Sequence, residues 1–407
     1  MDSIALIVHS LLSWRARSAS PPEASPMLLL WQEEQTYKAL GERIRIVHQL
    51  KRAPRVRRLS LAPLGDESSN GFFSDTSRVF LTYRSVENSR KYSRGQLPST
   101  LIMKTEGSYN AHFARAAAQV KASEREYLFY MHIRPLLVRD VRTPIVYECS
   151  PSCILMEDLS PTARLLDQEK GASLASSEKA LATAANLHAK FWQGHMDSKT
   201  AATVDALVVS GEGSRGWLSM VKSRHCHVWT RLGFFGMGGT ENDEKAIGSF
   251  LFDNADAILR RITTGRNATI IHGDYRAGNL MMTKDEGECV VLDWQTYCVG
   301  LGLYDVAGIV VGSMTVPDSR KHCLSLLRGY QRRLAALGID YPWEDLWTDF
   351  RVCILAQGFL VNYILEGCVD ETGLMKGGTP PLFEKFCNRI VDAILRYDCM
   401  DETLFDA

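Results

Sequence analysis

Four polar side chains within residues 271–295 have types and a spacing that suit phosphoryl transfer: His272, Asp274, Asn279 and Asp293. Transfer of a phosphoryl group from ATP needs a carboxylate that orients an attacking hydroxyl and accepts its proton, and oxygen ligands that hold magnesium on the phosphates. Asp274 fits the first requirement, and Asn279, five residues later, fits the second. Asp293 follows the apolar run 290–292, so we expect it at the end of a strand, as a second ligand of the same Mg²⁺.

The spacing H-x-D-x-x-x-x-N is that of kinase catalytic loops. The competing interpretation is a surface turn followed by an ordinary strand, but apolar runs at 268–271 and 290–292 flank the polar residues as buried strands would. Arg276, two residues after the proposed base, is a candidate for stabilising the transferring group. It can equally form a salt bridge that only braces the loop, and the sequence leaves both roles open.

A lysine further upstream fits the binding of ATP phosphates. Kinases hold the α- and β-phosphates with a Lys on a strand, and a Glu on a helix holds that Lys. Lys104 ends the apolar run 101–103, and the segment 78–83 before it alternates as a strand should. The two segments therefore predict a hairpin that carries Lys104.

The helix that should carry the glutamate is expected at residues 111–134, which lack proline and are rich in Ala, Glu, Lys and Arg. Glu126 shares one face of this helix with Phe129 and Tyr130. We therefore expect Glu126 to pair with Lys104, and Glu124 is the alternative.

The motifs HGDYRAGNLM, VVLDWQ and GLYDVAGIVVGS, with LIMK, EREYLFY and ILMEDLS upstream, together resemble those of the aminoglycoside phosphotransferase and choline kinase superfamily. Within it the chain most resembles the ecdysteroid-kinase-like (CHK kinase-like) branch. The resemblance covers roughly residues 60–400. It implies an α+β, bilobal protein-kinase-like fold, with a small β-rich N-lobe and a larger, mostly helical C-lobe.

The resemblance also implies roles for individual residues. Asp274 would be the catalytic base, Asn279 and Asp293 the magnesium ligands, and Lys104 with Glu126 the ion pair that binds ATP phosphates. The segment that joins the lobes and hydrogen-bonds the adenine through its backbone would include Met156, Glu157 and Asp158. Asp305 matches a carboxylate that anchors the catalytic loop.

The expected phosphate-binding loop departs from the usual pattern. Such loops use several glycines so that backbone N–H groups can approach phosphate oxygens. Residues 69–75 contain the single glycine Gly71. The hydroxyl of Ser74 can donate to a phosphate, whereas Asp75 would be unfavourable there unless it points away. A pseudokinase that binds nucleotide or a metabolite without turnover therefore stays open as an alternative.

The acceptor is expected to be a hydroxyl of a small molecule. A protein kinase carries Asp-Phe-Gly and a long segment ending in Ala-Pro-Glu, which forms the peptide platform. This chain has Asp293-Trp294-Gln295, no Ala-Pro-Glu, and reaches Asp305 twelve residues after Asp293. A choline-like acceptor would favour an aromatic cage, and four tryptophans are candidates for one: Trp217, Trp229, Trp294 and Trp347. The apolar segment 229–237 instead favours a hydrophobic or neutral alcohol.

Length and charge agree with this class of protein. A chain of 407 residues exceeds one typical hydrophobic core, so we expect two lobes. The predicted divisions are an extension at 1–55, partly disordered and then helical, an N-lobe at 56–157, and a C-lobe at 158–407 that holds the catalytic loop and substrate-binding helices. With 47 basic and 47 acidic residues, no net field attracts nucleic acid.

The location expected from sequence is the cytoplasm. No apolar run reaches the roughly 18 residues that span a bilayer, and ten scattered cysteines show no disulfide framework. In residues 4–20, positive charge follows the apolar stretch, whereas a secretory signal has it before. Mitochondrial targeting is the remaining alternative.

Overall fold

The computed structural model describes residues 26–50, 52–64, 74–84, 97–107, 111–208, 239–264, 267–285, 287–368 and 381–405. The chain divides into two compact units. The small unit comprises residues 1–117, 122–131 and 144–161, and the large unit comprises 118–121, 132–143 and 162–407.

The small unit is built on a five-stranded antiparallel sheet with the order β1-β2-β3-β5-β4. Its strands are β1 (Val56–Pro63), β2 (Ser74–Tyr83), β3 (Thr100–Glu106), β4 (Val146–Ser150) and β5 (Cys153–Glu157). The predicted pairing of the strand that carries Lys104 with the strand before it is confirmed, since Thr76 of β2 lies opposite Lys104 of β3.

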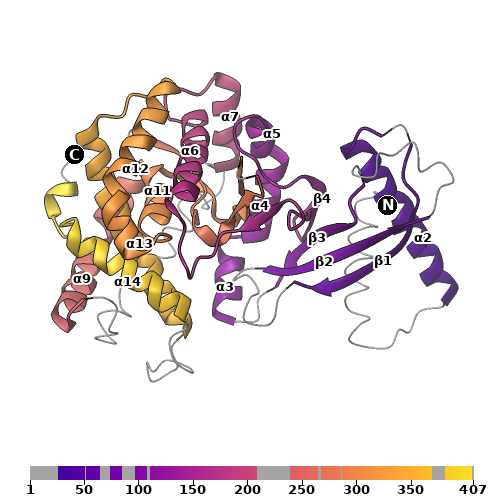
Figure 1. Ribbon diagram of the computed structural model, residues 1–407, viewed down its shortest axis with the longest axis horizontal. Coiled ribbons are helices and arrows are strands. Elements are labelled where there is room, and N and C mark those ends of the chain that lie inside the picture. Colours follow the sequence, from indigo (N-terminus) through magenta and orange to yellow (C-terminus); the bar gives the residue numbers. More distant parts are fainter. Residues whose placement is uncertain are drawn as a thin grey trace. The chain divides into compact units, whose positions relative to one another are not determined.

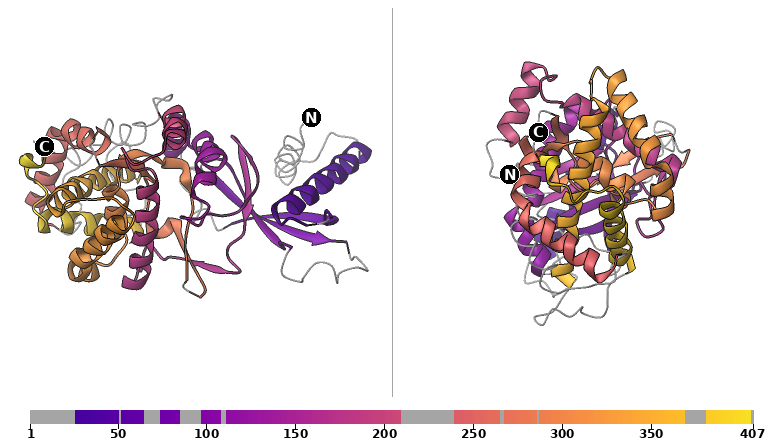
Figure 2. Two further views of the ribbon diagram at one scale, coloured as in Figure 1. Left: turned by 90° about the horizontal axis from the view of Figure 1, so that it is seen from above. Right: turned by 90° about the vertical axis from the view of Figure 1, so that its left-hand side faces the viewer.

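One face of this sheet is covered by helix α2 (Pro26–Val47), drawn in indigo beside the strands in Figure 1 and in the left view of Figure 2. Leu40 and Ile44 of α2 join Leu101 and Met103 of β3 in one buried cluster. Because side chains alternate along a strand, Lys104 points to the opposite face. The predicted helix before the sheet is therefore confirmed, and it leaves the face of Lys104 uncovered by α2.

The prediction of one continuous helix at 111–134 is wrong. The segment forms α3 (Ala111–Gln119), α4 (Ala122–Leu128) and a π-helical turn (Phe129–Ile133), followed by α5 (Arg134–Leu137). Lys121, between α3 and α4, has a left-handed φ of 51°, which ends the first helix. The face chosen for Glu126 is nevertheless buried, together with Phe129 and Tyr130.

The large unit contains two small antiparallel sheets and most of the described helices. Strands β6 (Ala163–Leu165), β8 (Leu280–Thr283) and β9 (Cys289–Val291) form one sheet, and β7 (Ala268–Ile271) pairs with β10 (Cys298–Leu301). Besides α5, its described α-helices from residue 162 onward are α6 (Leu174–Lys190), α7 (Ser198–Val208), α9 (Glu241–Asp253), α10 (Ala255–Thr264), α11 (Leu303–Val310), α12 (Val316–Ala336), α13 (Trp343–Cys368) and α14 (Pro381–Arg396). Helix α11 is buried along its length and contacts α6, α12 and α13.

Helix ends in the large unit follow local side chains. Helix α6 is capped by Ser173, whose hydroxyl accepts a hydrogen bond from Ser176 N. Helix α12 is capped in the same way by Thr315, whose hydroxyl accepts from Asp318 N. Gly338, just after α12, has a φ of 88°, a left-handed conformation that glycine adopts without strain at the end of a helix.

The predicted α+β architecture is confirmed, with a β-rich small unit and a mostly helical large unit. Among the described helices, none combines the length and apolar character that crossing a bilayer needs. Gly71, Trp217, Trp229 and the extension before residue 26 lie outside the described residues.

Candidate active site

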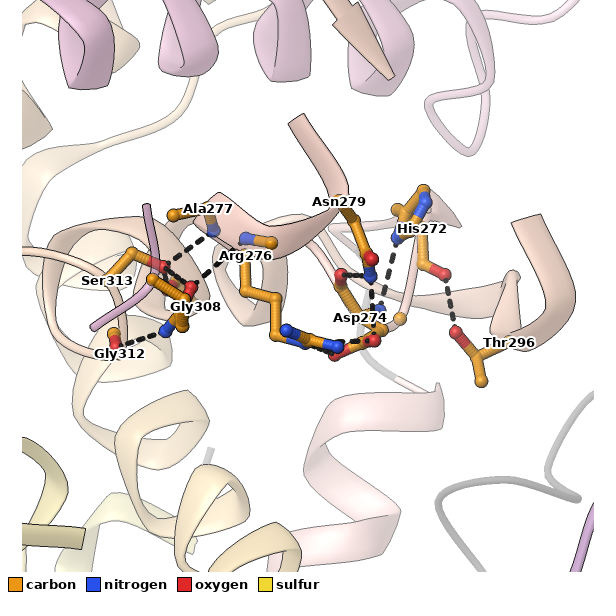
Figure 3. A network of polar contacts seen from close by, with 12 residues as sticks. His272, Asp274, Arg276, Ala277, Asn279, Thr296, Gly308, Gly312 and Ser313 are labelled. Atoms are coloured by element: carbon orange, nitrogen blue, oxygen red, sulfur yellow. Dashed lines mark hydrogen bonds and ion pairs between the residues drawn. The ribbon is translucent and has the colours of Figure 1, made fainter. Parts of the chain in front are cut away.

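The predicted catalytic loop begins where β7 ends and is held by the ring of His272. Nε2 of His272 lies 2.7 Å from the main-chain oxygen of Leu292, so this nitrogen carries the proton. Nδ1 then accepts a hydrogen bond from the main-chain N–H of Asp274 at 3.2 Å. The hydroxyl of Thr296 donates to the main-chain oxygen of His272 at 3.1 Å (Figure 3). The histidine thus positions the loop and is not placed to act as a base.

The three functional candidates of the loop are bonded to one another. The Asn279 amide nitrogen donates to Oδ2 of Asp274 at 2.7 Å and to the Asp274 main-chain oxygen at 2.8 Å. Nε of Arg276 lies 3.0 and 3.1 Å from the two carboxylate oxygens of Asp274 (Figure 3). The side chains of Asp274 and Arg276 are 22% and 24% exposed, so solvent reaches both. Arg276 is therefore the ion-pair partner of Asp274 in this structure.

Asn279 and Asp293 lie at the same end of the β8–β9 hairpin. Leu280 pairs with Val291, and Leu292 N donates to Asn279 O at 2.9 Å, which extends the ladder by one bond. Asp293 follows with φ 60° and ψ 70°, a left-handed conformation that Asp tolerates better than most residues. Such backbone conformations cluster at functional sites. The hairpin therefore explains how residues fourteen positions apart come to one end of a sheet.

Asp305 anchors the first half of the loop, as expected. It is fully buried, and its two oxygens accept from the main-chain N–H groups of His272 at 2.7 Å and Gly273 at 3.0 Å. Nε2 of His188 lies 3.2 Å from the same carboxylate, and Nδ1 of His188 lies 2.8 Å from the hydroxyl of Tyr330. His188 is therefore a buried core histidine with a hydrogen-bond partner at each ring nitrogen. A chain of polar contacts thus runs from α12 through α6 and α11 to the loop.

The predicted ion pair in the small unit is present. Nζ of Lys104 lies 2.7 Å from Oε2 of Glu126, with the two side chains 10% and 1% exposed. The choice of Glu126 over Glu124 is therefore confirmed, since Glu124 is exposed. The pair lies on the face of the sheet opposite α2.

Two of the other residues that were predicted to contact the nucleotide have side chains bonded within the small unit. Oδ2 of Asp158 accepts from Nε of Arg78 at 2.8 Å, and Oε2 of Glu157 accepts from Ile145 N at 3.1 Å. Met156 is buried within β5. Ser74 begins β2 and is also buried. These side chains hold the segment in place, so a contact with adenine would fall to the backbone.

Two features of the large unit were not predicted from sequence. Gln168 and Ser313 bind the second half of the loop through Gly278 and Ala277. Trp294 is fully buried, with its ring centroid 4.7 Å from that of His272, so it packs the loop and is excluded from an acceptor cage. The signal for Gln168 and Ser313 was weak, because each is an ordinary polar residue next to a loop or a helix end.

Helix α11 must also carry glycine to approach the loop. A Cβ on Gly308 would lie 2.5 Å from the main-chain oxygen of Tyr275, in the catalytic loop. Because that contact is to backbone, it has no side chain that can move away. Gly308, the second of the three glycines in the motif GLYDVAGIVVGS, therefore permits the close packing of α11 on the loop.

Comparison with solved structures found several kinases at low identity. A choline kinase from Cryptosporidium parvum Iowa II is 8% identical with a TM-score of 0.49, and the alignment covers 86% of this chain and 90% of that one. An ethanolamine kinase from Plasmodium vivax is 11% identical with a TM-score of 0.45, covering 84% and 81%. A macrolide 2′-phosphotransferase from Brachybacterium faecium is 16% identical with a TM-score of 0.43, covering 82% and 95%.

A search of curated proteins found none that matches this chain. A match does exist at the level of families, where the phosphotransferase enzyme family (APH) covers residues 88–347. This range includes Lys104, Glu126, the catalytic loop and Asp305. Since it is more than half of the sequence, the chain belongs to the phosphotransferase enzyme family.

Proposed function

We propose that this protein transfers the γ-phosphate of ATP to a hydroxyl of a small molecule, with Asp274 as the catalytic base. The observation that carries the proposal is the bonded group of Asp274, Asn279 and Arg276 at the end of a strand. The carboxylate is partly exposed and fixed by two donors, so it can accept a hydrogen bond from an incoming hydroxyl. Arg276, paired with this carboxylate, would orient it, and its guanidinium would also be close to a transferring phosphate.

The donor set at the hairpin end fits Mg²⁺. Both bonds from the Asn279 amide nitrogen go to Asp274, which directs the amide oxygen away from it. An amide oxygen and the carboxylate of Asp293 are hard ligands, and Mg²⁺ commonly takes one or two such groups and completes its shell with water and substrate phosphates. In the described ranges, no cluster of three or more His, Cys, Asp or Glu side chains forms a separate metal site. Bound there, Mg²⁺ would neutralise charge on the phosphate oxygens.

The ion pair of Lys104 and Glu126 supports nucleotide binding. A lysine held by a buried glutamate has a fixed direction, which suits binding of the α- and β-phosphates. The proposal places nucleotide binding in an N-lobe at 56–157, with the backbone at Met156, Glu157 and Asp158 for adenine and Gly71 and Ser74 near the phosphates. The C-lobe at 158–407 would supply Asp274, Asn279 and Asp293. The proposal requires both groups of residues to act on one nucleotide.

Membership of the phosphotransferase family agrees with a kinase but leaves the branch and the acceptor to be proposed. We infer the ecdysteroid-kinase-like branch from the sequence motifs, and a hydrophobic or neutral alcohol as acceptor. We also propose action in the cytoplasm, supported by the cysteines whose side chains the structure describes, since none of these eight forms a disulfide. Imaging of the tagged full-length chain in intact cells tests the location, and a mitochondrial pattern would contradict it.

The rival functions make different predictions in one experiment. The purified protein is incubated with Mg·ATP labelled at the γ-phosphate and a metabolite extract, beside the Asp274→Ala variant. Label in a small organic phosphate that requires Asp274 supports the proposal. Label in protein would indicate a protein kinase. ATP binding without transfer to any acceptor, including purified neutral alcohols, would favour the pseudokinase alternative.

A further inference from the structure

The second half of the catalytic loop is held by two buried side chains from segments that are 145 positions apart in the sequence. Ser313, after the end of α11, accepts at its hydroxyl from the main-chain N–H of Ala277 at 3.0 Å. Gln168, in the segment after β6, accepts at Oε1 from the main-chain N–H of Gly278 at 3.2 Å. Figure 3 shows Ser313 beside Ala277, with Gly308 and Gly312 of the helix end next to it.

These two bonds take the place of a side-chain N-cap for the short helical turn within the loop. Residues Ala277–Asn279 form a single 3₁₀ turn, and its N-cap residue, Arg276, makes no side-chain capping bond. The first N–H groups of a helix have no partner within it, and they need one when buried. Ser313 and Gln168 supply these partners, so the turn that ends at Asn279 depends on them.

Both side chains are themselves fixed. The Ser313 hydroxyl donates to Gly308 O at 2.8 Å, and the Gln168 amide nitrogen donates to Gly312 O at 2.9 Å. The second of these bonds settles which end of the Gln168 amide faces the loop. Ser313 is fully buried and Gln168 is 8% exposed. Neither group can turn without losing a partner.

Arg389 of α14 joins the segments that carry these side chains. Its Nη1 donates to the main-chain oxygens of Gln168 at 2.9 Å and Gly312 at 3.1 Å, and its Nη2 donates to Glu169 O at 3.1 Å. Among the described residues, no carboxylate forms an ion pair with this buried guanidinium, and burial lowers its pKa. A positive charge beyond the end of α11 also interacts favourably with the helix dipole.

We propose that Gln168 and Ser313 are positioning residues for phosphoryl transfer, because they fix the turn that carries Asn279 and so hold Asn279 and Arg276 against Asp274. This inference rests on the proposed function. The two residues act through the loop backbone, and they touch neither substrate nor metal in this account. Arg389 supports them by joining their two segments.

The test measures amide hydrogen exchange and kinetics on the same variants of the full-length protein. Gln168→Leu and Ser313→Ala each remove one acceptor of the loop. Gln331→Leu is the matched control, because Gln331 also donates its amide to a main-chain oxygen, that of Tyr341 at 2.7 Å, and does not bond to the loop. Exchange is followed by mass spectrometry on peptides that cover residues 272–282.

We expect amide exchange in residues 272–282 to become at least about tenfold faster in both loop variants and to stay unchanged in Gln331→Leu. We also expect kcat to fall by about 10- to 100-fold, the range of a group that positions a catalytic residue, with KM for ATP within about twofold. Ser313→Ala removes a single oxygen, so it decides the question if Gln168→Leu lowers the melting temperature too far. Unchanged exchange in Ser313→Ala, or faster exchange with unchanged kcat, would overturn the inference. A wild-type protein that transfers no phosphate would refute the proposed function instead, and the exchange data would still show whether the two side chains hold the loop.

Discussion

The amide nitrogen of Asn279 lies 2.7 Å from Oδ2 of Asp274 and 2.8 Å from the main-chain oxygen of the same residue. The proposed base and a proposed magnesium ligand are therefore fixed to each other within one loop, without help from a substrate. The same contact sets the direction of the Asn279 amide, since its nitrogen must face Asp274.

Substituting Asn279 by Asp tests the contact itself. The variant keeps the size of the side chain but places a second carboxylate within hydrogen-bond distance of Asp274. Two carboxylates that close cannot both stay ionised, so the pair should titrate with one raised apparent pKa. We expect kcat to fall at least about 100-fold at neutral pH, measured as a pH–rate profile. Wild-type kcat and an unchanged profile in Asn279→Asp would show that the contact has no role.

Lys104→Met should impair both ATP use and the stability of the small unit. It leaves the buried Glu126 without its partner at 2.7 Å, and breaking a buried pair costs about 3–5 kcal/mol. We expect kcat/KM for ATP to fall by about 100-fold or more, together with a lower melting temperature. Arg43→Met is the control, because it breaks the 2.8 Å pair with the buried Glu148 on another part of the same sheet. It should lower the melting temperature while kcat/KM for ATP stays near the wild-type value; equal kinetic losses in both variants would argue against a phosphate-binding Lys104.

Asp305→Asn should loosen the first half of the loop. One of its two carboxylate oxygens is replaced by an amide nitrogen, which cannot accept, so one of the main-chain N–H groups of His272 and Gly273 loses its acceptor. Loss of a hydrogen bond to a buried charge costs about 2 kcal/mol, and kcat should fall with it. Asp349→Asn is the control, since Asp349 is equally buried and is held by Arg261, Asn267 and Tyr341. Both variants should have lower melting temperatures than the wild type. An equal loss of kcat in Asp349→Asn and Asp305→Asn would contradict a specific role of Asp305 in the loop.

Acid should weaken the segment after β5 through Asp158. Burial raises the pKa of this carboxyl, but hydrogen bonds from Ser160 and Thr100 and the charge of Arg78 outweigh it, so the net pKa is lowered. A group whose pKa is lowered in the folded state stabilises it above the unfolded pKa of about 4, and that contribution is lost as pH falls through the folded value. Melting temperatures of wild type and Asp158→Asn should therefore converge below about pH 4. A difference that persists unchanged at pH 3 would contradict this linkage.

The sequence was sufficient for the parts of the site that are local. Asp274 and Asn279 share one loop, and an apolar strand leads to Asp293, so their spacing was enough to predict that the three belong to one site. The strand of Lys104 and the helical face of Glu126 were also predicted, because alternation and helical periodicity mark buried faces. The pairing of β8 with β9 places Asn279 and Asp293 at one end of the hairpin, as their spacing predicted.

The sequence was not sufficient to predict the features that depend on tertiary contacts. Gln168 lies 110 positions from its loop partner Gly278, and Ser313 lies 36 positions from Ala277, and no periodic pattern links such pairs. The break at Lys121 was missed because neither glycine nor proline marks it, although its φ is 51°. The starts of α6 and α12 are also hard to predict from sequence, since several Ser and Thr residues near each start can cap a helix.

The most direct test of the central claim measures Mg·ATP binding and phosphate transfer in wild type and Asp274→Asn side by side. The variant is isosteric and keeps a side-chain oxygen beside Asn279, so calorimetry should give an ATP affinity within about threefold of wild type. Transfer of the γ-phosphate, to the identified acceptor or slowly to water, should fall by about 10²- to 10⁴-fold, the contribution of a general base. Transfer that survives in Asp274→Asn, or ATP binding that is lost with it, would contradict the assignment of Asp274 as the base.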